Sequence, residues 1–180
     1  SKAGRRLLRT MVAFKFDPVD LIFSAGGAVA AMMILHFVHT QAMVQGYSAM
    51  CPPLGAVAVL VFALPAAPAS KPISVAAGFL FGSIAVYGIY ELVGDDFMKE
   101  FGGTRALLVG GAIAAMKITD CVHPPVGAYA VLMADVPAIK ALGPKYILYP
   151  GLTGALVLVL VSVVTNAIKD AISKNKIKKA

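Results

Sequence analysis

The chain has 180 residues, of which 59% are apolar and only 14% charged, with a mean hydropathy of +0.82 and a formal net charge of +7. Soluble domains average roughly 45–50% apolar and about 25% charged residues, so the composition excludes a water-soluble globule and indicates a membrane protein. Polar connections are short, which leaves room for one membrane domain and none for a soluble catalytic domain.

Basic residues cluster at the two ends of the chain: Lys2, Arg5, Arg6, Arg9 and Lys15 before the first apolar run, and Lys169, Lys174, Lys176, Lys178 and Lys179 after the last. Such clusters are typical of orientation signals and of anchors to anionic membrane lipids, and we expect no nucleic-acid partner. By the positive-inside tendency both ends lie on one side, which requires an even number of crossings. The chain starts at Ser1, so we expect a leader, such as an organellar transit peptide, to have been removed or to lie outside this numbering.

In chain order we expect a basic segment over 1–20, a single transmembrane domain over 21–168 and a basic tail over 169–180. A helix needs about 20 apolar residues to cross the hydrocarbon layer, and four runs are long enough: 21–42, 73–93, 106–122 and 146–168. Two further runs, 53–64 and 125–134, are too short and are expected as re-entrant, broken or half-spanning helices. The predicted fold class is an all-α membrane protein.

The sequence contains an internal repeat. Residues 52–60 and 124–132 are identical at seven of nine positions, and residues 26–32 and 110–116 at six of seven. The first pair lies 72 residues apart and the second 84, so the first copy carries 12 extra residues in the region 36–50. We expect two repeats, about 21–94 and 104–168, each with two long helices and one short helix that begins at a double proline.

The number of crossings depends on the short helices. If they cross, each repeat has three segments and the repeats are inverted, as in many secondary transporters. If they are re-entrant, each repeat crosses twice and the halves run parallel. We favour the inverted 3+3 arrangement, because it places the acidic loop 94–104 opposite the basic ends.

The double prolines carry the most specific chemistry. Proline is accepted in the first turn of a helix, so Pro52, Pro53, Pro124 and Pro125 mark two helix breaks and starts. The amides that follow are expected to point out of the partly positive helix end, which binds anions without a charged side chain. The predicted anion-binding residues are Gly55, Ala56, His123, Gly127 and Ala128.

His123 precedes the second proline pair, where the first repeat has Cys51. An ionisable group inside a membrane is a functional candidate, and His123 either donates to an anion and couples protons or braces the break. Lys117 and Asp120, three apart, are expected to form an ion pair or, as the lesser alternative, a coupling relay. Tyr87, Tyr90, Tyr146 and Tyr149 are expected at the membrane interface. No signature predicts an enzyme, a metal or a cofactor.

The run 121–132, Cys-Val-His-Pro-Pro-Val-Gly-Ala-Tyr-Ala-Val-Leu, resembles the signature of the HPP family of integral membrane proteins. Residues 53–65, Lys71-Pro72 and 149–156 look like further blocks of that family. The resemblance implies four transmembrane helices. Because some plastid and cyanobacterial members are implicated in nitrite transport, it also implies a small-anion transporter, in a plastid inner envelope or another organelle inner membrane, or in a bacterial plasma membrane.

Together these features predict transport of a small inorganic anion, with nitrite as the best guess, between two Pro-Pro helix starts. The alternative is a non-transporting accessory subunit of a respiratory or photosynthetic membrane complex. Association into a homo-oligomer or a larger complex stays open, and so does the choice between carrier and channel.

Overall fold

The computed structural model describes residues 17–97 and 99–179, and every regular element within them is helical. The basic cluster predicted before Asp17 lies outside the described residues. The α-helices are α2 (Pro18–Val44), α3 (Pro53–Ala58), α4 (Pro72–Val93), α5 (Gly103–Ile118), α6 (Pro125–Asp135), α7 (Pro137–Lys140) and α8 (Gly151–Lys179). One π-helical turn, η1 (Val59–Ala63), and three 3₁₀ turns, η2 (Pro68–Ser70), η3 (Lys99–Phe101) and η4 (Gly143–Ile147), complete the elements.

Prolines and one capping aspartate determine where several helices start. Pro18, Pro53, Pro72 and Pro125 each occupy the first position of a helix, where the absent N–H would have no partner. Asp17 caps α2 by accepting hydrogen bonds from the amides of Val19 and Asp20, at 2.9 and 3.4 Å. The two short helices predicted from the proline pairs are therefore confirmed.

Three stretches of the described chain are long and apolar enough to cross a membrane: Pro18–Val44, Pro72–Val93 and Gly143–Lys174. The span predicted over 106–122 is wrong in its bounds, because α5 begins at Gly103 and ends at Ile118 after 16 residues. The chain then turns at Asp120, which has a φ of 51°. A residue in this left-handed region ends a helix, and the double proline that follows prevents its continuation.

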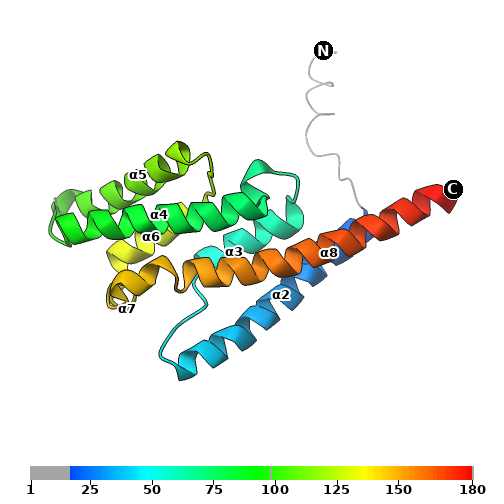
Figure 1. Cartoon of the computed structure of the whole chain (residues 1–180), viewed down its shortest axis with the longest axis horizontal. Coiled ribbons are helices and arrows are strands. Elements are labelled where there is room, and N and C mark those ends of the chain that lie inside the picture. Colours follow the sequence, from blue (N-terminus) through cyan, green and yellow to red (C-terminus); the bar gives the residue numbers. More distant parts are fainter. Residues whose placement is uncertain (1–16, 98, 180) are drawn as a thin grey trace, which may run out of the picture.

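The helices form one elongated bundle (Figure 1). Helices α2 and α4 run one way along its long axis, and α5 and α8 run the other way. Both ends of the described chain lie at the same end of the bundle. Helix α8 continues to Lys179, so residues 169–179 of the predicted basic tail are helical and project beyond the neighbouring helices.

The main helix contacts fall within and between the two halves of the chain. Helix α4 packs on α5, and α8 packs on α2. In the centre α3 meets α6, while α4 meets α8. Helix α6 also contacts α4 and α5. Helix α3 contacts α8, and η1 contacts both α8 and α2.

Glycines allow the closest of these approaches. A Cβ atom on Gly82 of α4 would overlap Val126 of α6, and one on Gly154 of α8 would overlap Leu54 of α3. Gly27 packs against Thr165 and Phe62, where a Cβ would lie 2.7 and 3.0 Å from their side chains. Small residues of this kind let helices in lipid pack tightly.

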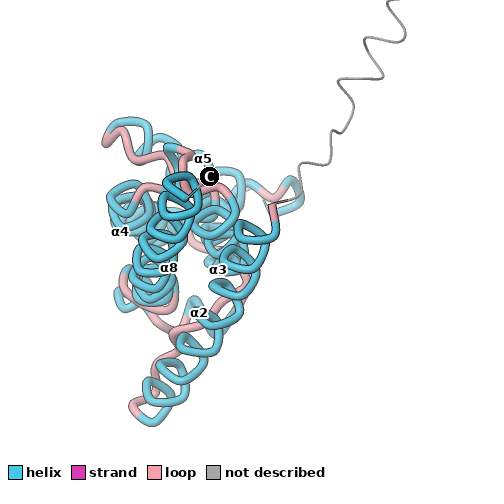
Figure 2. Tube along the Cα trace, turned by 90° about the vertical axis from the view of Figure 1, so that its right-hand side faces the viewer, coloured by secondary structure: helices cyan, strands magenta, loops and turns pink. Residues whose placement is uncertain are grey.

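Helix α2 lies at the periphery. Viewed from the end of the bundle, it reaches away from the other helices (Figure 2). Only 17% of its most apolar stretch is buried, against 39% for α4. Helix α2 has 27 residues, whereas α5 has 16.

The π-helical turn η1 leaves backbone carbonyls that need donors, because its wider turn departs from the α-helical hydrogen-bond ladder. Asn166 of α8 donates its side-chain amide to the carbonyl of Val61 at 3.1 Å. The carbonyl of Leu60 accepts from the backbone amide of Leu64 at 3.1 Å and also from the hydroxyl of Ser70 at 2.9 Å. Irregular backbone at membrane depth is tolerated where protein groups satisfy it in this way.

We therefore expect Asn166→Ala to destabilise the protein by about 1–3 kcal/mol, because the carbonyl of Val61 loses its donor. The matched control is Thr165→Val. Thr165 donates only to the carbonyl of Val161 within its own helix, so its loss should cost less than about 0.5 kcal/mol. Unfolding in mixed micelles would measure both, and equal losses for the two variants would contradict the role of Asn166.

Candidate functional site: a buried histidine at a helix break

The break between α5 and α6 brings His123 into the core. After the turn at Asp120 the segment 121–124 is non-helical, as the residue before a proline tends to be. His123 is fully buried, with 0% of its surface exposed. Cys121, two residues earlier, is also buried, with 3% of its surface exposed.

Elements from both halves hold the His123 ring. Its Nδ1 lies 2.8 Å from the carbonyl oxygen of Ala69 in η2. The ring packs against Phe79 of α4, with centroids 5.5 Å apart, and its backbone amide lies 3.3 Å from the sulfur of Met116. A Cβ on Gly78 would lie 2.8 Å from the Cβ of His123, so the absence of a side chain at Gly78 leaves room for the histidine.

The other ring nitrogen has no partner. Nε2 of His123 is buried and makes no hydrogen bond within the described residues. Because a carbonyl oxygen only accepts, the Ala69 contact assigns the proton of the neutral ring to Nδ1. Nε2 then presents a buried lone pair, an arrangement that costs roughly 1–3 kcal/mol if nothing occupies it.

The helix starts differ from the prediction. The amides of Leu54 and Gly55 donate to the carbonyls of Cys51 and Pro52, both at 3.1 Å. Val126 and Gly127 donate in the same way to His123 and Pro124, at 3.1 and 3.0 Å. The expectation that the amides around Gly55 and Gly127 are free for an anion is therefore wrong for this conformation, because a tight first turn already uses them.

The predicted site residues also differ in burial. Pro53 and Pro125 are buried, whereas Pro52 and Pro124 are exposed. Gly55, Ala56 and Ala128 are exposed and Gly127 is half-buried, and nothing lies within 4 Å of a Cβ added to either glycine. The structure brings α3 and α6 together, and one predicted anion-binding residue, His123, has a buried side-chain atom without a hydrogen-bond partner.

The predicted ion pair of Lys117 with Asp120 is wrong. Both residues are exposed, and the pair is not among the four ion pairs of the described chain. The helix ends at Ile118, so the two residues do not share a helix face.

The ion pairs lie near the two ends of the bundle. At the end formed by the α4–α5 loop, Lys140 pairs with Asp95 at 2.5 Å and Arg105 with Asp135 at 2.7 Å. The hydrogen bond from Lys140 holds the pKa of the Asp95 carboxyl below its usual value. At the other end Lys169 of α8 pairs with Asp20 of α2 at 3.0 Å.

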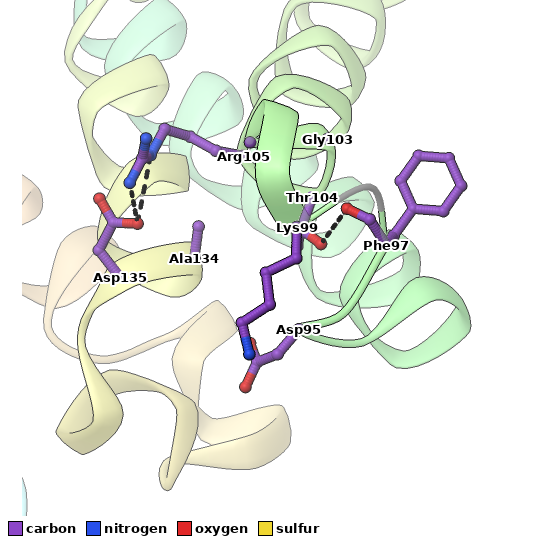
Figure 3. A pocket seen from close by; sticks show the side chains of 9 residues that line it. Asp95, Phe97, Lys99, Gly103, Thr104, Arg105, Ala134 and Asp135 are labelled. Carbon is purple, nitrogen blue, oxygen red and sulfur yellow. Dashed lines mark hydrogen bonds and ion pairs between the residues drawn. The ribbon is translucent and has the colours of Figure 1, made fainter.

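A polar cavity of about 180 Å³ lies at the loop end of the bundle. Figure 3 shows Arg105 bridging to Asp135 across it, with Asp95, Phe97 and Lys99 along the loop side. An apolar groove runs along α2 beside Met50, and a second polar cavity, of about 270 Å³, is lined by Lys169 and Asp20. None of these three is lined by His123, Gly55 or Gly127. Because His123 is 0% exposed, the packing around it is closed in this conformation.

A buried tyrosine pair stands next to the histidine. Tyr129 and Tyr146 stack with ring centroids 4.4 Å apart, and each donates its hydroxyl to a backbone carbonyl at the other residue. Phe79 links this pair to His123, since its ring lies 5.6 Å from that of Tyr129. Tyr146, which was predicted at the membrane interface, is 0% exposed and packs within the protein core.

Sequence reasoning missed the partners of His123. Ala69, Phe79 and Met116 are ordinary apolar residues, and nothing in their spacing indicates that they meet. Asn166 did leave a signal, as a single amide within an otherwise apolar span, which in lipid implies an interhelical hydrogen bond.

The fold and its apolar helices define the class: an all-helical integral membrane protein. Residues 14–175 match the transmembrane region of the HPP family, and the chain belongs to that family. A curated transmembrane protein of Dictyostelium discoideum is 30% identical over 109 residues, which cover 61% of this chain and 38% of that protein. The chain thus spans well under half the length of this relative. No solved structure matches.

Proposed function

We propose that the chain transports a small monovalent inorganic anion, with nitrite as the best single substrate, and that the anion binds at His123. The observation that carries the proposal is the buried Nε2 of His123, which has no partner. A polar group is rarely left unpaired in a membrane protein core, and ionisable residues there mark substrate and proton pathways.

The proposal includes two inverted repeats, one of α2, α3 and α4 and one of α5, α6 and α8. Exchanging the repeats converts the α4–α5 contact into the α8–α2 contact and leaves α3–α6 and α4–α8 unchanged. The close approaches of Gly82 to Val126 and of Gly154 to Leu54 exchange in the same way, since each pair maps onto the other at the 72-residue offset. The opposite directions of α2 and α5, and of α4 and α8, also support inversion.

Inverted repeats provide a mechanism for alternating access, in which one half rocks against the other around a central site. His123 belongs to the second half and contacts Ala69 and Phe79 of the first, so such a motion would rearrange its surroundings. In this account the closed packing around His123 is an occluded state, and rocking opens it to one side at a time.

An accessory role in a larger membrane complex is the second candidate. The hydrogen bonds within the two helix starts and the closed packing around His123 favour it, because both fit a histidine that braces the break. Co-purification of the intact chain with a large respiratory or photosynthetic complex would support this alternative.

The test is flux into sealed liposomes that contain the purified protein. We expect nitrite and nitrate to enter several-fold faster than into protein-free liposomes, and we expect nitrate to give the lower background because its acid form is negligible. The absence of flux for both anions, under either direction of gradient, would contradict the proposed function and favour the accessory role.

A further inference from the structure

The hydrogen bond between His123 and Ala69 limits what the site can bind. It assigns the single N–H of the neutral ring to Nδ1, 2.8 Å from the carbonyl, and leaves Nε2 as an acceptor only. An anion such as nitrite or nitrate also offers only lone pairs. Neutral His123 and a bare anion therefore repel each other, and a hydrogen bond between them requires a proton.

Two arrangements supply that proton. Either Nε2 carries it and the resulting imidazolium donates to the anion, or the anion carries it and donates to Nε2. Both contain one proton and one anion, and both have no net charge. Binding therefore requires one proton for each anion, whichever partner holds the proton.

The surrounding core offers no other positive charge. Apart from His123, the buried polar residues of the described chain are serines and one threonine. Of the charged residues near the break, Lys71, Lys117 and Asp120 are all exposed. An uncompensated anion in such a core would cost several kcal/mol.

The neighbouring titratable groups supply no positive charge that could replace the missing proton. The elements around His123 contribute Ala69 from η2, Gly78 and Phe79 from α4, and Met116 from α5, none of which titrates. The titratable groups that the same core contains, buried or partly buried, are the thiols of Cys51 and Cys121 and the phenols of Tyr87, Tyr90, Tyr129 and Tyr146. The hydroxyls of Tyr129 and Tyr146 already donate to backbone carbonyls.

We propose that this protein moves one proton with each anion, so that transport is electroneutral cotransport. The inference rests on the proposed function and specifies its coupling. On the side of entry the proton comes from water and an N–H bond forms at Nε2 as the anion binds. On the side of release that bond breaks, and proton and anion both leave to water.

The experiment uses nitrate as the probe, because its conjugate acid is fully ionised near neutral pH and carries no protons across lipid by itself. Sealed liposomes containing the full chain hold a pH-sensitive dye inside, and nitrate influx is measured together with internal acidification. A potassium gradient with valinomycin sets the membrane potential independently of the pH gradient.

We expect one proton to enter with each nitrate, and the influx to respond to the pH gradient but not to the membrane potential. Nitrate influx that follows the potential without acidification would overturn the coupling and leave anion transport intact. No influx of nitrate, and none of nitrite in parallel liposomes, would overturn the proposed function and the coupling together.

Two histidine variants sharpen the result. Glutamine at His123 can donate to an anion without taking up a proton, so any influx remaining in His123→Gln should carry no protons and follow the potential. His36→Gln, at an exposed position on α2, should keep the wild-type ratio of protons to nitrate. Proton-coupled influx in His123→Gln would overturn the proposal, and if this variant fails to fold, the wild-type ratio alone decides.

Discussion

Gly82→Leu is expected to destabilise the protein by roughly 3 kcal/mol or more, the upper range for overpacking a filled core. A single Cβ at this position already overlaps Val126 of α6, and the β-branched valine has little freedom to move away. Gly154→Leu should have a comparable effect, since a Cβ there overlaps Leu54 of α3. Thermal unfolding in detergent micelles, followed by size-exclusion chromatography, measures both.

The matched control is Gly110→Leu on α5. Gly110 is exposed, and nothing lies within 4 Å of a Cβ added there. Leucine at this position should face lipid and change stability by less than about 0.5 kcal/mol. If Gly82→Leu and Gly110→Leu unfold at the same temperature, the close contact of α4 with α6 is wrong.

His123→Ala is expected to lower anion flux by about 10- to 100-fold, because a hydrogen bond to a charged group contributes roughly 1.5–3 kcal/mol and each 1.4 kcal/mol is tenfold. The fold should survive, since the replacement removes an unpartnered polar atom as well as the bond to Ala69. Initial rates of nitrate influx, normalised to the amount of reconstituted protein, provide the measurement.

His36→Ala serves as the control, because His36 is exposed on the peripheral helix α2. We expect its flux to equal that of the wild type. Equal flux for His123→Ala and the wild type would mean that His123 only braces the break between α5 and α6.

The short helices could be predicted from the sequence because proline acts locally. Its fixed φ and absent N–H place a helix start at Pro53 and Pro125 whatever the surroundings. The span over 106–122 could not be predicted in the same way. Its end depends on the backbone of Asp120, and the apolar residues on both sides of the turn hide the break.

The candidate site could be predicted only in part. The cost of burying an ionisable group singles out His123, and the structure places it in the core. The anion-binding role of the amides after Pro53 and Pro125 followed from an ideal helix start, whereas the tight first turns use these amides internally. The contacts of His123 with Ala69 and Phe79 join distant parts of the chain, and no local pattern encodes them.

The account depends on an anion and a proton meeting at Nε2 of His123, and nitrogen NMR observes that atom directly. Protein labelled with ¹⁵N-histidine contains three imidazoles, and comparison with His123→Gln assigns the signal of His123. Without nitrate, near neutral pH, Nε2 should resonate as an unprotonated ring nitrogen. Saturating nitrate should move it into the protonated range and leave His36 and His39 unchanged, whereas a His123 signal that is the same with and without nitrate would contradict the account.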